Sequence, residues 1–189
     1  MRKPIVLSLV ALSMAAPALA HPGHEASGFV HPFTGLDHFA AMIGVGMWAG
    51  LLALRRPAAA LLVPLAFLVM MAVGAAAGFA GIKLPLVEAF ILASVFVIGG
   101  LVMGAVRLPA AWAMVIVGLF AFFHGYAHAQ EAPAAGAGGY ILGFMVATAV
   151  LQAAGLALAW SVRRLAGDLG VRAVGGAMMA AGALVIVAH

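Results

Sequence analysis

Apolar residues run along this chain in six long, nearly continuous stretches, and short polar breaks separate them. The stretches cover residues 35–54, 58–81, 84–106, 109–130, 140–162 and 171–188. A helix needs roughly 20 apolar residues to cross the hydrocarbon core of a bilayer. Only helices and closed barrels satisfy their backbone polar groups in lipid, and a barrel needs short segments of alternating residues. We therefore predict an all-α integral membrane protein with six transmembrane helices.

The first twenty residues have a different pattern, which is typical of a secretory signal peptide. Arg2 and Lys3 precede a short apolar stretch, and an Ala-Leu-Ala tripeptide ending at Ala20 fits the cleavage rule. The alternative is an uncleaved first helix, but the apolar stretch is short for a membrane span. The predicted parts are a signal peptide over residues 1–20, an external tail over 21–34 and a six-helix transmembrane domain over 35–189.

The positive charges are distributed unevenly among the breaks between the stretches. The first, third and fifth breaks contain Arg55, Arg56, Arg107, Arg163, Arg164 and Arg172. The second and fourth breaks hold only Lys83 as a cation. Because cytoplasmic loops of membrane proteins are enriched in Lys and Arg, we expect the arginine-containing loops in the cytoplasm. Both ends of the mature chain then lie on the outer side of the membrane, which agrees with the signal peptide.

Composition excludes several classes of protein. Hydrophobic residues make up 67% of the 189 residues and charged residues only 7%, whereas a soluble domain carries about 25% charged residues. A soluble enzyme is therefore excluded. The absence of cysteine excludes disulfides, thiolate metal sites and iron–sulfur clusters. The net charge of +4 does not indicate nucleic-acid binding, because the basic residues are spread over loops. The chain contains no G-x-x-x-x-G-K-[ST] motif, so ATP use is not expected. No organic cofactor is expected either.

Polar residues that are costly inside a bilayer gather on the external side of this topology. Such residues are functional hypotheses by default. They are His31, Asp37 and His38 around the start of the first span, Glu88 in the third, His124, His128 and Glu131 at the end of the fourth, and His21 and His24 on the tail. A solvated or capping role is the alternative for the tail histidines, and snorkelling to the interface is the alternative for Glu88. The pattern as a whole predicts a shared metal site.

The spacing of these residues indicates how such a site is built. His124 and His128 are four residues apart and share one helix face, which is a common clamp for a divalent metal. Glu131 continues this face if the helix extends that far. Asp37 and His38 point about 100° apart on a regular helix, so one binds the metal and the other orients it. Which of the two is the ligand stays open at this point.

The types of donor atom limit which metals the site can bind. Imidazole and carboxylate groups without thiolate suit nickel, cobalt, zinc, copper(II) or non-haem iron. Magnesium and calcium prefer sites made of oxygen alone, so the histidine content is evidence against them.

Three motifs resemble those of the HupE/UreJ family. They are H-P-F-T-G-L-D-H beginning at His31, V-E-A-F-I-L-A-S beginning at Val87 and H-G-Y-A-H-A-Q-E beginning at His124. Members of this family are hydrogenase and urease accessory membrane proteins regarded as nickel and cobalt permeases. The resemblance implies transport of a divalent transition metal, most of all nickel or cobalt, across the inner membrane of a bacterium. The outer side of this membrane, with both mature termini, is then the periplasm. Family members often carry a histidine in the fifth helix at the position of Gln152, and this departure leaves the metal preference open.

The expected function is therefore that of a permease rather than an enzyme. Its partners are the metal ion, as transported substrate, and the lipid bilayer. The alternatives are a metal-binding scaffold or sensor, and an intramembrane metal-dependent hydrolase. The hydrolase is disfavoured because the H-E-x-x-H motif is absent and no Ser or Cys nucleophile accompanies a base. The sequence leaves open the oligomeric state, the coupling ion and the metalloenzyme that receives the metal.

Overall fold

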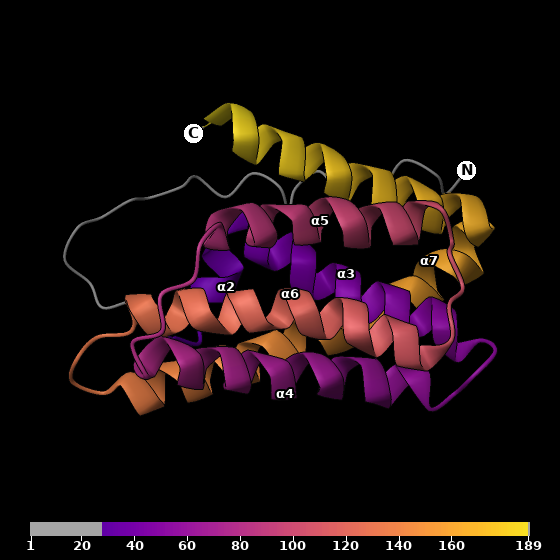
Figure 1. Cartoon of the computed structure of the whole chain (residues 1–189). Coiled ribbons are helices and arrows are strands. Elements are labelled where there is room, and N and C mark those ends of the chain that lie inside the picture. Colours follow the sequence, from indigo (N-terminus) through magenta and orange to yellow (C-terminus); the bar gives the residue numbers. More distant parts are fainter. Residues whose placement is uncertain (1–27, 189) are drawn as a thin grey trace.

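Every regular element in residues 28–188, the part of the chain that the computed structural model describes, is a helix (Figure 1). The elements are α2 (His31–Thr34), α3 (Leu36–Ala53), α4 (Ala59–Phe79), α5 (Val87–Met103), α6 (Ala110–Glu131) and α7 (Ala137–Ala188). The prediction of an all-α fold is confirmed. The predicted signal peptide and the tail residues His21 and His24 lie outside the described residues.

Four of these helices, α3, α4, α6 and α7, are long and apolar enough to cross a membrane, and α5 is a shorter apolar helix of 17 residues. The 52 residues of α7 would extend about 78 Å as one straight helix, which is more than twice a hydrocarbon core of about 30 Å. Gly167 interrupts α7 with a φ of 66° and a ψ of −163°. Figure 1 shows that α7 turns back on itself near this kink. We call the parts of α7 before and after Gly167 its first and second limbs, and they correspond to the predicted fifth and sixth spans.

Glycines bring α3 and the first limb of α7 into backbone contact. A Cβ added to Gly46 would collide with the carbonyl oxygen of Gln152, and one added to Gly155 would collide with the carbonyl oxygen of Ile43. The contact is reciprocal, because each glycine meets the carbonyl three residues before the other glycine. Small residues permit such close approach of membrane helices. The two helices are therefore held at a separation that larger residues would not permit.

The same arrangement joins α4 and α6. A Cβ on Gly74 would collide with the carbonyl oxygen of Phe122, and one on Gly125 would collide with the carbonyl oxygen of Met71. Gly125 directly follows His124 in the chain. This backbone contact therefore sets the depth and the rotation of the segment of α6 that carries the histidines.

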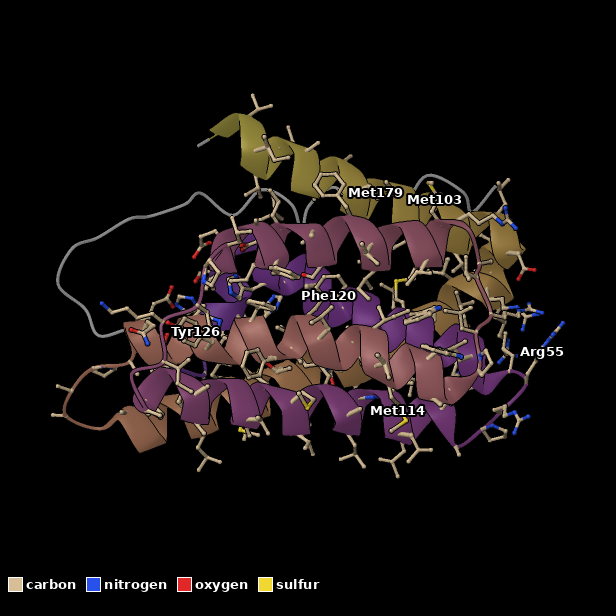
Figure 2. All side chains as sticks on the ribbon, viewed as in Figure 1. Arg55, Met103, Met114, Phe120, Tyr126 and Met179 are labelled. Carbon is tan, nitrogen blue, oxygen red and sulfur yellow. The ribbon has the colours of Figure 1, made fainter. Side chains whose placement is uncertain are left out.

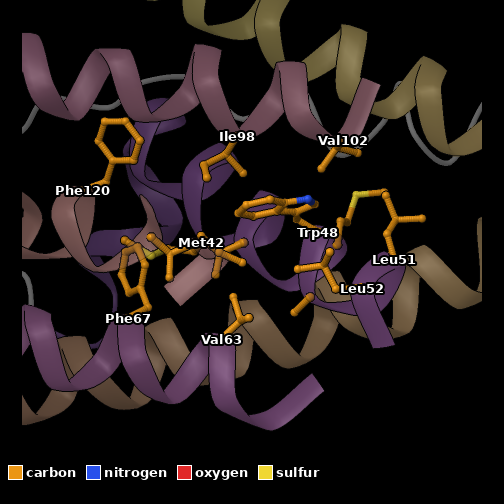
Figure 3. Close-up of a cluster of buried hydrophobic side chains, with 14 of the residues drawn as sticks. Met42, Trp48, Leu51, Leu52, Val63, Phe67, Ile98, Val102 and Phe120 are labelled. Carbon is orange, nitrogen blue, oxygen red and sulfur yellow. The ribbon is translucent and has the colours of Figure 1, made fainter. Parts of the chain in front are cut away.

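An apolar core fills the middle of the bundle. Met42, Trp48 and Phe67 are at most 1% exposed, and Figure 3 shows them packed with Phe120 and Ile98 between the helices. Histidines lie at one end of this core and arginines at the other. Figure 2 labels Tyr126 at the histidine end and Arg55 at the arginine end.

Candidate metal centre

A break between α2 and α3 places two of the histidines. Gly35 has extended backbone, with φ −86° and ψ 117°, and it separates the two helices. A Cβ on Gly35 would lie 3.1 Å from Asp37 Oδ1 and 3.2 Å from His38 Nδ1. The glycine therefore leaves room for these two side chains, and the change of direction brings the ring of His31 within 5.8 Å of the His38 ring, measured between centroids.

Four imidazole rings from α2, α3 and α6 lie edge to face at the histidine end of the bundle. The centroid of His38 lies 4.7 Å from that of His128 and 5.1 Å from that of His124. The centroids of His31 and His128 are 4.8 Å apart. Residues far apart in the sequence thus form one compact group, which we call the histidine cage: His31, His38, His124 and His128.

The two histidines of α6 each donate one ring hydrogen to an acceptor in their own helix. His124 Nδ1 lies 3.0 Å from the carbonyl oxygen of Phe120, and His128 Nδ1 lies 3.1 Å from Glu131 Oε2. A carbonyl and a carboxylate oxygen can only accept, so Nδ1 carries the hydrogen in both rings. The Nε2 atom of each ring then has a free lone pair. α6 ends at Glu131, so this carboxylate does continue the histidine face.

The structure also indicates the roles of the adjacent Asp37 and His38. Asp37 Oδ1 accepts hydrogen bonds from the backbone N–H of His38 and from its Nδ1, both at 2.8 Å. The carboxylate is thus oriented toward the back of the imidazole, and Nε2 of His38 faces the other rings. This geometry favours His38 as the ligand and Asp37 as the group that orients it.

Three ring nitrogens in the cage have no partner within the part of the chain that the structure describes. The Nε2 atoms of His38, His124 and His128 are buried, and none has a hydrogen-bond partner in the described part of the chain. Each buried unsatisfied polar atom costs roughly 1–3 kcal/mol, so three together need an explanation. Metal-binding histidines generally donate their other ring hydrogen to a carboxylate or a backbone carbonyl. All three rings have this arrangement, so the donor set fits a divalent transition metal.

The rim of the cage is more open to solvent. His31 Nε2 lies 3.5 Å from Glu131 Oε2, and ligand atoms of His31, His128 and Glu131 all lie within 4.8 Å of one another. Partial burial lowers the pKa of His31 below its ordinary value, while the charge of Glu131 opposes this shift. A lowered pKa keeps the imidazole neutral, which is the form that binds metal.

Two phenylalanines close the cage, and neither was among the predicted site residues. Phe144 of α7 is buried, and its ring centroid lies 3.6 Å from that of His128 and 6.4 Å from that of His38. The ring centroid of Phe67 of α4 lies 5.9 Å from that of His124. Among so many apolar residues, neither position has a pattern that would distinguish it. The two rings exclude water, which strengthens polar interactions within the cage.

Glu88 lies apart from the cage. It is exposed in the first turn of α5, and no hydrogen bond or ion pair found among residues 28–188 joins it to a histidine. Met42, which follows His38 by one turn, is fully buried in the apolar core. The structure therefore brings together His31, Asp37, His38, His124, His128 and Glu131 among the predicted site residues.

Comparison with known proteins agrees with the motifs. The profile of the family described as HupE / UreJ protein matches residues 9–185. Protein HupE of Rhizobium leguminosarum bv. viciae is 41% identical over 188 residues, and the match covers 97% of each chain. No solved structure matches this chain. A match over nearly the whole length places the protein in a known family, and the chain belongs to the HupE/UreJ family.

Proposed function

We propose that this protein is an inner-membrane permease for a divalent transition metal, with nickel or cobalt as the foremost substrate. The observation that carries the proposal is the set of three buried Nε2 atoms, on His38, His124 and His128, that have no partner in the described chain. The HupE/UreJ family, whose members are hydrogenase and urease accessory proteins, supports the assignment. Nickel and cobalt are both suited by imidazole ligands.

The ion is received first at the rim. His31 and Glu131 are partly exposed there, and one carboxylate beside a neutral imidazole attracts a hydrated cation. The tail residues His21 and His24 raise the local metal concentration, because a tethered ligand increases the encounter rate. From the rim the ion moves to the buried rings, where Nε2 atoms replace water molecules of its hydration shell.

The cage then holds the partly dehydrated ion. Asp37 contributes negative charge behind His38, and its hydrogen bond raises the basicity of the imidazole. From the cage the ion moves toward the arginine end, which we assign to the cytoplasm. A membrane potential of 100 mV supplies about 2.3 kcal/mol per charge, so about 4.6 kcal/mol for a divalent ion. Uptake driven by the potential therefore needs no ATP.

A second candidate function follows from the apolar core. In the middle of the bundle, Met42, Phe67 and Phe120 belong to one cluster of buried apolar side chains (Figure 3). A scaffold or sensor that binds metal without moving it would have such a closed core. A permease would have it as well, in a state that is open to the outside and closed to the cytoplasm.

Flux measurements separate the two functions. Purified protein is reconstituted into liposomes that contain a nickel-sensitive dye, and nickel or cobalt is added outside. The permease predicts dye quenching well above that of protein-free liposomes, and quenching that is accelerated by an inside-negative potential. Binding of nickel to the purified protein without any flux would contradict the permease and support the scaffold.

Topology is tested independently of flux. Reporter proteins that are active only in the cytoplasm are fused after Arg55, after Arg107 and at His189. We expect activity at the first two fusions and none at His189, because the arginine loops lie inside. Cytoplasmic activity at His189 would contradict the proposed orientation of the bundle.

A further inference from the structure

A glutamine side chain lies buried beneath the histidine cage, and the described residues offer it no hydrogen-bond partner. Gln152 on the first limb of α7 is 1% exposed. Neither its Oε1 nor its Nε2 makes a hydrogen bond within the described chain. Buried polar groups are almost always hydrogen-bonded in native proteins, and each exception needs an explanation. In the sequence, Gln152 stands out only as a departure from the pattern of the HupE/UreJ family.

Gln152 lies on the face of α7 that meets the cage. Phe144, Thr148 and Gln152 follow one another at intervals of four residues and therefore share one helix face. Phe144 packs against the ring of His128, with 3.6 Å between the ring centroids. Gln152 is two turns farther along, about 12 Å toward the arginine end. Its backbone touches Gly46, which likewise lies two turns after His38 on α3.

Thr148 occupies the intermediate level. Thr148 is fully buried, and its Oγ1 lies 4.0 Å from Met71 Sδ. A thioether sulfur is only a weak acceptor. The carbonyl of Met71 meets Gly125, the residue after His124. Thr148 therefore lies at the depth of His124, and Gln152 lies one turn deeper. Buried polar groups thus continue below the cage, along one face of α7.

We propose that Gln152, with Thr148, forms a second binding station for the transported divalent cation, one turn below His124. This inference rests on the proposed permease function. The station offers an amide oxygen and a hydroxyl oxygen, which are neutral donors and suit nickel or cobalt less well than imidazole. An ion that retains part of its hydration shell binds there weakly and leaves readily. Conduction requires such weak, successive sites, because one tight site would retain the ion.

The central experiment replaces Gln152 by leucine, which is similar in size and has no polar atoms. In liposomes, nickel uptake by Gln152→Leu is expected to fall at least tenfold at saturating nickel. Equilibrium nickel binding to the purified protein is expected to stay within twofold of wild type, because the cage is intact. The midpoint of thermal unfolding is expected to be unchanged or raised, since an unsatisfied buried amide is removed. Uptake within twofold of wild type would overturn the proposal.

Further variants distinguish a ligand from a merely structural residue. Gln152→His restores a metal donor, and we expect at least half of the wild-type uptake. Thr148→Val keeps the shape of the side chain and is expected to lower uptake about fivefold. The matched control is Ser94→Ala, a buried hydroxyl on α5 that already bonds the carbonyl of Ile91, and its uptake should equal that of wild type. A Gln152→His protein as inactive as Gln152→Leu would overturn the ligand role. The ligand role would also be overturned if every Gln152 and Thr148 variant lost uptake together with a lowered midpoint of thermal unfolding.

Nickel flux through the wild-type protein distinguishes a failure of the permease function from a failure of the second station. If wild-type protein moves no nickel, the permease function itself is wrong. If wild-type protein moves nickel and Gln152→Leu moves it equally fast, the function stands and only the second station is wrong.

Discussion

The two ends of this bundle are both rich in polar side chains, but they are built in opposite ways. At the histidine end the rings of His124 and His128 are fully buried, and their Nδ1 atoms have partners while their Nε2 atoms have none among residues 28–188. At the arginine end the side chains are solvated. Arg163 Nε pairs with Asp168 Oδ1 at 2.9 Å, with both side chains partly exposed. Burial without a partner indicates chemistry, whereas exposure indicates a role in topology.

The open space at the arginine end agrees with this difference. A hollow of about 410 Å³ lies there, and Arg55, Arg56 and Arg107 line it. Guanidinium groups only donate hydrogen bonds and carry positive charge, so they cannot bind a metal cation. The histidine cage instead presents ring nitrogens with free lone pairs, on His38, His124 and His128. We therefore expect metal to bind at the histidine cage and in the bundle beneath it, and not among the arginines that line this hollow.

The largest effect is expected from His124→Ala. This change removes a buried Nε2 that every ion passing through the cage meets, so nickel uptake into liposomes should fall at least 100-fold. Excess nickel should not restore uptake, because the lost step is dehydration rather than capture. The control is Phe123→Leu, a change at the residue before His124 and outside the cage. Phe123 stacks on Phe90 of α5, with 4.0 Å between the ring centroids, so this variant should keep its uptake. Full rescue of His124→Ala by excess nickel would reduce the cage to a capture site.

The next effect is expected from Asp37→Asn. The amide keeps the size of the side chain but loses the charge that holds His38 Nδ1–H at 2.8 Å. Loss of such an orienting group lowers metal affinity about 10- to 100-fold. Isothermal titration of the purified protein with nickel measures this change. An unchanged affinity would show that Asp37 does not orient the ligand, and the roles of Asp37 and His38 would have to be reassigned.

A smaller effect is expected from pH. Burial lowers the pKa of His31, so the folded protein keeps this ring neutral below about 6.5, the pKa of free histidine. The unfolded chain takes up the proton first, so this residue lowers stability as the pH falls below that value. Nickel binding at the rim should therefore be lost at a lower pH than free histidine would allow, as the pH falls through the lowered pKa of His31. This pH dependence is measured by following nickel binding to the His124→Ala protein, in which the rim is intact, as the pH is lowered. A midpoint at or above 6.5 would contradict the expectation.

The smallest effect is expected at the other end of the bundle. Arg163→Ala breaks the exposed pair with Asp168, and exposed ion pairs contribute little to stability. Nickel affinity and uptake should both stay within twofold of wild type. A tenfold loss of uptake without loss of protein from the membrane would contradict the contrast between the ends, because it would give the arginine end a direct part in transport.

Much of this protein can be predicted from the order of its residues. The six apolar stretches are long enough to require helices in a bilayer, because backbone groups find no other partners there. The spacing of His124, His128 and Glu131 places them on one helix face whatever surrounds that helix. The motifs that begin at His31 and His124 also identify the family. These features are local, so they depend only on neighbouring residues.

The composition of the site was decided by the packing of the helices. Periodicity shows which side chains share a face, but it does not show which helices are neighbours. The backbone contacts of Gly125 with Met71 and of Gly46 with Gln152 set those neighbours. They bury Gln152 below the cage, whereas Glu88, which has the more conspicuous side chain, stays exposed. A residue's chemistry depends on its burial and on its partners, and both arise only when segments distant in sequence pack together.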